Sequence, residues 1–400
     1  MRFRNFAKSG HLPTLFSSFL YFDASFMIWV LLGALGTFVA SDFQLTPGQK
    51  GLLVAVPTLA GSAFRIILGW AETKFGGKRT ALVGIVVSMI PLLWGWLSAG
   101  QLWELYAVGI LLGVAGASFA VALPMASRWF PPQYQGLVMG IAGAGNSGTL
   151  LATLFGPRLA QSFGWHAVFG FAVIPMIVTF FVVLALAKEA SRPGGARLDK
   201  GMYRAALRRR DTWALCVLYS LTFGGFVGFS NYLGIFFHDQ YGVSKVAAGE
   251  LQTLVVAAGS FLRPVGGYIA DRIGGTRFLI GLFAAGTILC FVASQFLPLA
   301  FEVAVFFCLM GCLGMGNGAV FQVVPVRMKE LVGVATGMIG AAGGVGGFLL
   351  PSILGGLKGV TGTYATGLTV FVFALAVGAG MAAILRVRWR KWGHSLQLQI

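Results

Sequence analysis

Apolar runs, each about as long as a membrane-crossing helix, recur along the whole chain. A bilayer core about 30 Å thick needs about 20 apolar residues in a helix that crosses it. Twelve runs meet this requirement, and they predict spans near residues 15–40, 51–71, 80–98, 105–127, 137–158, 165–187, 212–237, 247–269, 278–296, 301–326, 333–357 and 364–385. The pattern predicts an all-α membrane protein with twelve transmembrane helices in two pseudo-symmetric six-helix bundles, residues 1–187 and 212–400, joined by a linker over 188–211.

The positions of lysine and arginine predict the orientation of these spans. Cytoplasmic loops carry an excess of both residues. Every second connection is basic, and so are the linker, with its arginine triplet at 208–210, and the C-terminal tail. The other connections hold only Lys50, Arg158, Lys245 and Lys358. We therefore expect a multi-pass protein of the plasma (cell inner) membrane, with both termini and the linker in the cytoplasm.

Composition agrees with a membrane protein and removes several other classes. The 400 residues are 57% hydrophobic and only 10% charged, whereas a soluble domain has about 25% charged residues. The net charge of +17 arises in short loops, so membrane topology explains it better than nucleic acid does. The four cysteines lie inside apolar runs without metal or redox spacing. The sequence contains no P-loop, and we expect no metal, no cofactor and no ATP drive.

The chain contains an internal repeat. Residues 61–79 and 259–277 share their glycine and arginine positions at an offset of 198, and residues 136–145 and 333–342 match at an offset of 197. Two six-helix halves in parallel repeat are the organisation of major facilitator transporters. The segment 267–277 resembles the loop motif of that superfamily, G-x-x-x-D-R-x-G-x-x-R. The first copy departs from the motif, because Thr73 stands at the aspartate position with Glu72 beside it.

Two arginines lie in the middle of apolar runs, where charge is costly and usually functional. Arg65 and Arg263 occupy equivalent positions of the repeat, and Asp23 is the only acidic residue well inside any predicted span. A guanidinium stays charged and offers a planar fork of donors that suits planar oxyanions. We expect a paired anion site. Pairing of each arginine with a carboxylate, or extension of its side chain to the membrane surface, are the alternatives.

Glycines crowd the fifth and eleventh predicted spans. Glycines allow close helix approach. Close approach would leave a narrow cavity for a small anion, and the alternative is that these glycines serve helix packing alone. The candidate gating or packing glycines are Gly143, Gly145, Gly148, Gly340, Gly343 and Gly344. Packing does not explain Asn146, whose side-chain amide can donate a hydrogen bond to an oxyanion.

These features together resemble the nitrate/nitrite porter family of the major facilitator superfamily. The match consists of an arginine in spans two and eight, glycine-rich spans five and eleven, and an aromatic first span with Phe22, Phe26 and Trp29 on one face. The resemblance implies that both arginines clamp the anion and that Asn146 hydrogen-bonds it. It implies further substrate-binding residues, for which ordinary packing is the alternative: Asn317, Tyr219, Phe223, Phe22 and Phe26.

Asp23 is the candidate proton-coupling residue, because no histidine lies deep in a predicted span. A structural partner for an arginine, or a carboxyl kept neutral by burial, are the other interpretations. The resemblance implies a monomeric carrier, not an enzyme, that moves nitrate or nitrite by alternating access. We expect proton-coupled nitrate symport in nitrate assimilation.

Several rival functions stay open. One is a nitrate/nitrite antiporter, and another is a major facilitator carrier for a different small or organic anion. A non-transporting nitrate sensor would normally carry an added soluble domain. A membrane enzyme or haem carrier would need paired histidines or clustered carboxylates within the spans, and the sequence has neither.

Overall fold

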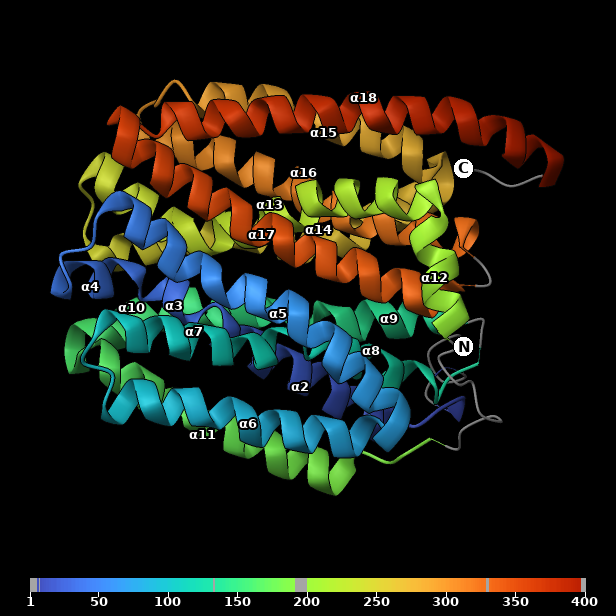
Figure 1. Cartoon of the computed structure of the whole chain (residues 1–400), viewed down its shortest axis with the longest axis horizontal. Helices are drawn as coiled ribbons and strands as arrows, with labels where there is room; N and C mark the ends of the chain where they lie inside the picture. The colour runs from blue at the N-terminus through green and yellow to red at the C-terminus, as the bar shows by residue number, and fades with distance from the viewer. Residues whose placement is uncertain (1–5, 7, 132–133, 191–199, 329–330, 397–400) are drawn as a thin grey trace. The chain divides into compact units, whose positions relative to one another are not determined.

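The computed structural model describes residues 6, 8–131, 134–190, 200–328 and 331–396. All regular secondary structure within these ranges is helical (Figure 1). The predicted all-α class is therefore confirmed.

Eleven helical segments in the described residues are long and apolar enough to cross a membrane. Most are single helices: α5 (Pro47–Phe75), α6 (Gly77–Leu97), α11 (Trp165–Leu186), α13 (Arg210–Tyr241), α14 (Lys245–Ile273), α15 (Gly275–Ala293), α16 (Leu299–Arg327), α17 (Val332–Thr361) and α18 (Ala365–Leu396). Two spans are interrupted, and they consist of α7 (Leu102–Gly116) with α8 (Phe119–Ser127), and of α9 (Gln135–Gly143), the 3₁₀ turn η2 (Ala144–Ser147) and α10 (Gly148–Phe163). Each corresponds to one predicted span.

The first predicted span, 15–40, is built from three consecutive helical segments. They are α2 (Leu12–Trp29), α3 (Leu31–Ala34) and α4 (Gly36–Asp42). α2 has 18 residues and includes Asp23 and several hydroxyl side chains, and the other two segments are much shorter. This division is why the span is not among the eleven long apolar ones.

The chain forms two compact units. The first contains residues 1–35 and 56–199, and the second contains residues 36–55 and 200–400. Residues 36–55 therefore pack with the C-terminal part of the chain, although they precede the linker. The division of the chain at 188–211 into two halves stays a prediction.

Glycines bring helix backbones into direct contact in the second unit. A Cβ added at Gly266 would strike the backbone of Met315, and one at Gly318 would strike the carbonyl of Arg263. α14 and α16 thus meet through their main chains, as small residues permit in membrane helices. This close approach explains why glycine stands at positions 266 and 318.

Ion pairs join helix ends in both units. Glu72 on α5 forms a two-pronged pair with Arg128 after α8, at 2.5 and 2.8 Å. In the second unit Arg327 on α16 pairs with Asp211 on α13 at 2.8 Å. Glu72 thus supplies a carboxylate next to the position where the repeat has Thr73 in place of an aspartate.

Candidate functional site

Arg65 is buried in the first unit, 4% exposed, in the middle of α5. Its Nε–H donates a hydrogen bond to the carbonyl of Gly116 at 3.2 Å. The guanidinium carbon also lies 5.5 Å from the ring centre of Trp29 and 5.8 Å from that of Phe119. Aromatic faces at this distance stabilise a cation, so the protein itself holds the charge of Arg65 inside the helix bundle.

An aromatic cluster connects Arg65 to the first predicted span. Phe22 contacts Phe26 edge to face at 4.7 Å between ring centres, and Phe119 at 5.6 Å. Phe26 contacts Trp29 at 4.8 Å. The structure therefore brings Phe22 and Phe26 into one cluster with Arg65, through Trp29 and Phe119.

Asn146 lies in the 3₁₀ turn η2, which packs on α2. A Cβ at Gly145 would lie 2.7 Å from the ring of Phe22, and one at Gly148 would collide with the carbonyl of Asp23. Asn146 is 1% exposed, and both atoms of its side-chain amide lack a hydrogen-bond partner among the described residues. An amide buried in this way usually carries a free-energy cost, and a bound ligand would remove it.

Asp23 lies beside this turn. The hydroxyl of Ser147 donates to a carboxylate oxygen of Asp23 at 2.7 Å. Asp23, the candidate proton carrier, is thus hydrogen-bonded to Ser147, the residue that follows Asn146. Gly143, by contrast, has open space where a Cβ would stand.

His11 caps the N-terminus of α2, the helix that carries Asp23. Its ring Nδ1 accepts a hydrogen bond from the backbone N–H of Thr14 at 3.2 Å. Burial, together with the positive charge of Lys188, lowers the pKa of His11 below its usual value. The neutral ring therefore keeps its acceptor nitrogen at neutral pH.

Arg263 and Asn317 lie on neighbouring helices in the second unit. One terminal nitrogen of Arg263, Nη1, is buried without a hydrogen-bond partner among the described residues. Asn317 on α16 is fully buried, and both of its amide atoms also lack partners there. Next to it, Gly318 lies against the backbone of Arg263. The second unit thus also holds an arginine and, on the neighbouring helix, a buried amide without hydrogen bonds among the described residues.

Tyr219 and Phe223 stack face to face on α13, with ring centres 5.0 Å apart and planes 5° apart. Phe321 meets Tyr219 edge to face at 4.8 Å. A Cβ at Gly343 would lie 2.7 Å from the ring of Tyr219, so this glycine of α17 makes room for the stack. Gly340 and Gly344 belong to the same helix.

Sequence reasoning missed two residues that contact Arg65, namely Phe119 and Gly116. Both flank the interruption between α7 and α8, where no proline marks a break. No sequence signal separates them from the other small and apolar residues of that span. Only the contacts with the guanidinium reveal them.

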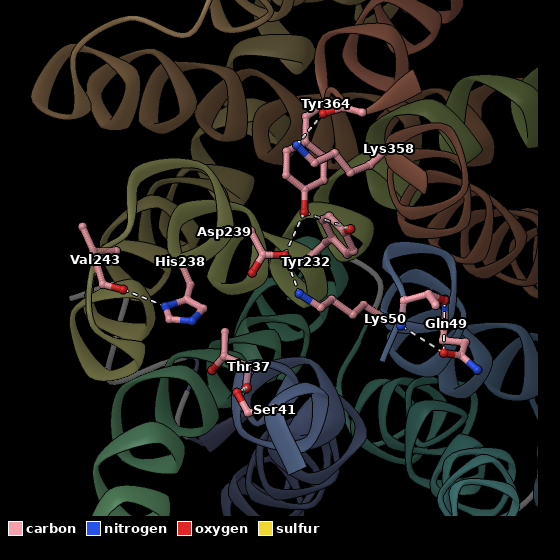
Figure 2. A network of polar contacts seen from close by, with 12 residues as sticks. Thr37, Ser41, Gln49, Lys50, Tyr232, His238, Asp239, Val243, Lys358 and Tyr364 are labelled. Atoms are coloured by element: carbon pink, nitrogen blue, oxygen red, sulfur yellow. Dashed lines mark hydrogen bonds and ion pairs between the residues drawn. The ribbon is translucent and has the colours of Figure 1, made fainter. Parts of the chain in front are cut away.

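A second polar network lies at the other end of α13 in the second unit (Figure 2). Lys50 pairs with Asp239 at 2.6 Å, and the hydroxyl of Tyr364 donates to the same carboxylate at 3.2 Å. Tyr232 donates to Tyr364. An adjoining cavity of about 330 Å³ is lined by Lys50, His238 and Asp239 among others. The network fastens the start of α5 to α13.

Comparison with known proteins identifies the family of the chain. Residues 17–351 match the model of the Major Facilitator Superfamily. A nitrite extrusion protein of Bacillus subtilis is 32% identical over 94% of this chain and 93% of its own. The probable nitrate/nitrite transporter NarK2 of Mycobacterium tuberculosis is 35% identical over 90% and 93%. The probable nitrate/nitrite antiporter NarK1 of Thermus thermophilus is 29% identical over 89% and 87%.

A solved structure also shares the fold. It is a bacterial homologue of the human lysosomal transporter Spinster, with a TM-score of 0.68 and 17% identity over 92% of this chain and 95% of that one. The family confirms the prediction of a multi-pass membrane transporter rather than an enzyme. The chain belongs to the nitrate/nitrite porter family of the major facilitator superfamily.

Proposed function

We propose that this protein carries nitrate and nitrite across the plasma membrane by alternating access, with Arg65 and Arg263 as the anion ligands. The names of three relatives, which describe nitrite extrusion, nitrate/nitrite transport and nitrate/nitrite antiport, support this substrate class. Arginine provides a fixed charge and a planar donor fork that match a planar oxyanion.

The observation that carries the proposal is the unsatisfied buried polarity in the same compact unit as each arginine. Asn146 in one unit and Asn317 in the other have no hydrogen-bond partner among the described residues for any amide atom, and the same holds for Nη1 of Arg263. Buried polar groups are almost always paired. An anion that accepts hydrogen bonds from the amide nitrogens and from Arg263 would satisfy these donors.

Proton coupling through Asp23 is the finer part of the proposal. Two arginines around one monovalent anion leave a net positive charge, and an ionised Asp23 would offset that charge in the empty carrier. Its bond to Ser147, the neighbour of Asn146, supports a link between protonation and anion binding. The proposed reaction is therefore proton–nitrate symport. Obligatory nitrate/nitrite exchange is the second candidate, and the name of the Thermus thermophilus relative favours it.

A pH-gradient experiment in proteoliposomes separates symport from exchange. With no anion inside, an inward proton gradient should drive accumulation of labelled nitrate. Asp23→Asn should abolish that accumulation while leaving nitrate binding measurable. Uptake that requires internal nitrite and ignores the pH gradient would identify an exchanger.

Competition identifies the substrate class. Unlabelled nitrate and nitrite should reduce the uptake of labelled nitrate, and larger carboxylates such as succinate should not. Strong inhibition by the carboxylates with none by nitrite would favour a carrier for organic anions.

We further propose that the protein works as a monomer with both termini in the cytoplasm.

A further inference from the structure

We propose that Trp29 is a positioning residue that fixes the guanidinium of Arg65 in its anion-binding orientation, together with the carbonyl of Gly116. The inference rests on the proposed function, in which Arg65 binds the anion. It adds that the two arginines of the carrier are not equivalent, because the protein holds the guanidinium of Arg65, whereas Nη1 of Arg263 has no hydrogen-bond partner among the described residues.

The indole of Trp29 is itself held in one position. It is fully buried, and its N–H donates to the carbonyl of Pro57 at 2.7 Å. Two glycines complete its seat, because a Cβ at Gly61 would lie 3.1 Å from the indole nitrogen, and one at Gly116 would collide with the ring. A ring fixed by a hydrogen bond and two backbones presents its face to Arg65 in a single geometry.

The interruption of the helix between α7 and α8 supplies the second contact of Arg65. In a continuous α-helix the N–H of Ala120 would donate to the carbonyl of Gly116. Here that N–H donates to Ala117 instead, at 3.0 Å. The carbonyl of Gly116 is thereby free to accept from Nε of Arg65 at 3.2 Å. The interruption of the span therefore creates an acceptor for the guanidinium.

The repeat provides an internal comparison. Gly259 corresponds to Gly61, and a Cβ there would lie 2.6 Å from Phe226. Phe226 thus takes the place of Trp29, without an indole N–H. Gly314, which lies 198 residues after Gly116, is inside α16, and that helix has no interruption there.

The second copy of the repeat therefore has neither the indole N–H nor the interruption of the helix. Its arginine, Arg263, has a buried nitrogen with no hydrogen-bond partner in the described part of the chain. Arg65 is thus a preorganised ligand, and Arg263 completes its bonds with the anion. Preorganisation raises affinity by reducing the ordering cost of binding.

Nitrate titration of purified variants tests the proposal. Trp29→Leu removes the aromatic face, and we expect nitrate affinity to fall about tenfold. Trp29→Phe keeps an aromatic face and should lose less. Gly116→Ala should also weaken nitrate binding, because its methyl group displaces the indole.

Gly69→Ala is the matched control, because it lies on α5 one turn beyond Arg65 and its Cβ would make only an ordinary 3.8 Å contact. It should bind nitrate as wild type does. Wild-type affinity in folded Trp29→Leu would overturn the proposal, and so would wild-type affinity in folded Gly116→Ala. If Trp29→Leu does not fold, the nitrate affinities of Trp29→Phe and Gly116→Ala decide the question.

Arg65→Lys separates this inference from the proposed function. Loss of binding in Arg65→Lys but not in Trp29→Leu would leave the anion site standing and remove the positioning role. Normal binding in Arg65→Lys would refute the anion site itself. A purely structural tryptophan would change thermal stability without changing the nitrate affinity of the folded protein.

Discussion

At the scale of single residues, the proposed anion site combines charge with unsatisfied hydrogen-bonding capacity. Arg65 is surrounded by aromatic rings and a carbonyl, and Arg263 keeps a buried nitrogen that lacks a partner in the described chain. Asn146 and Asn317 add one amide in each unit. Such groups reduce stability unless a ligand supplies their missing hydrogen bonds. Replacing them by apolar residues should therefore lower anion affinity without lowering the stability of the empty protein.

The first prediction concerns the planar fork of the arginines. Arg65→Lys and Arg263→Lys keep the positive charge but lose bidentate bonding. Each charge-assisted bond contributes roughly 1.5–3 kcal/mol, which corresponds to a loss in nitrate affinity of about tenfold or more. Calorimetric titration of the purified variants measures this loss. Unchanged affinity in both variants would exclude the clamp.

The second prediction separates binding from stability at the amides. Replacement of Asn146 or Asn317 by leucine removes a buried polar group that lacks hydrogen bonds, a group that costs about 1–3 kcal/mol. Thermal unfolding without nitrate should therefore be unchanged or shifted upward, while nitrate affinity falls. A lower unfolding temperature with normal affinity would show that the amides are structural.

Sequence reasoning reached the arginines and Asn146 because polar groups in apolar runs are conspicuous. It did not reach Phe119 or Gly116, because phenylalanine and glycine are common throughout the spans. Their contacts with Arg65 depend on the helix interruption between α7 and α8, which the amino-acid pattern does not mark. The positions of eleven of the twelve predicted spans were predictable from apolar length, whereas the division of the first span into three helical segments was not.

At the scale of elements, residues 36–55 are the part of the structure that the sequence pattern did not anticipate. They belong to the compact unit formed with residues 200–400. The Lys50–Asp239 network of Figure 2 and a backbone contact between α5 and α17 fasten them there. This attachment ties the end of the first predicted span and the start of α5 to the C-terminal part of the chain.

The third prediction tests the backbone contact with two adjacent glycines of α17. A Cβ at Gly355 would collide with the carbonyl of Pro47 and lie 3.0 Å from the amide nitrogen of Gly51, whereas one at Gly356 meets nothing within 4 Å. Gly355→Ala should destabilise the protein by about 1–3 kcal/mol through overpacking. Gly356→Ala should be neutral or stabilise by roughly 0.5–1 kcal/mol through helix propensity. Thermal unfolding of both variants measures the difference, and equal behaviour would mean that the close approach contributes nothing.

At the scale of the whole molecule, the internal repeat and the basic connections describe a carrier with two related halves. The offset of 198 places Arg65 and Arg263 at equivalent positions, and family membership supports alternating access between the halves. The two copies differ where Trp29 and the break after Gly116 hold Arg65. A symmetric sequence pattern therefore contains an asymmetric site.

The fourth prediction concerns topology. The positions of lysine and arginine predict that residue 200 and both termini lie in the cytoplasm. A single cysteine introduced at position 200 should react with a membrane-impermeant maleimide only after the cells are opened, whereas one at position 358, in a connection expected outside, should react in intact cells. Labelling of position 200 from outside would reverse the orientation.

Flux of labelled nitrate into proteoliposomes tests the central claim most directly. Wild-type protein, given an inward proton gradient or internal nitrite, should take up nitrate well above protein-free vesicles. The Arg65→Lys/Arg263→Lys double variant, reconstituted in equal amount, should remain at the background. Equal nitrate flux through wild type and the double variant, or none through folded wild type under either condition, would contradict the account.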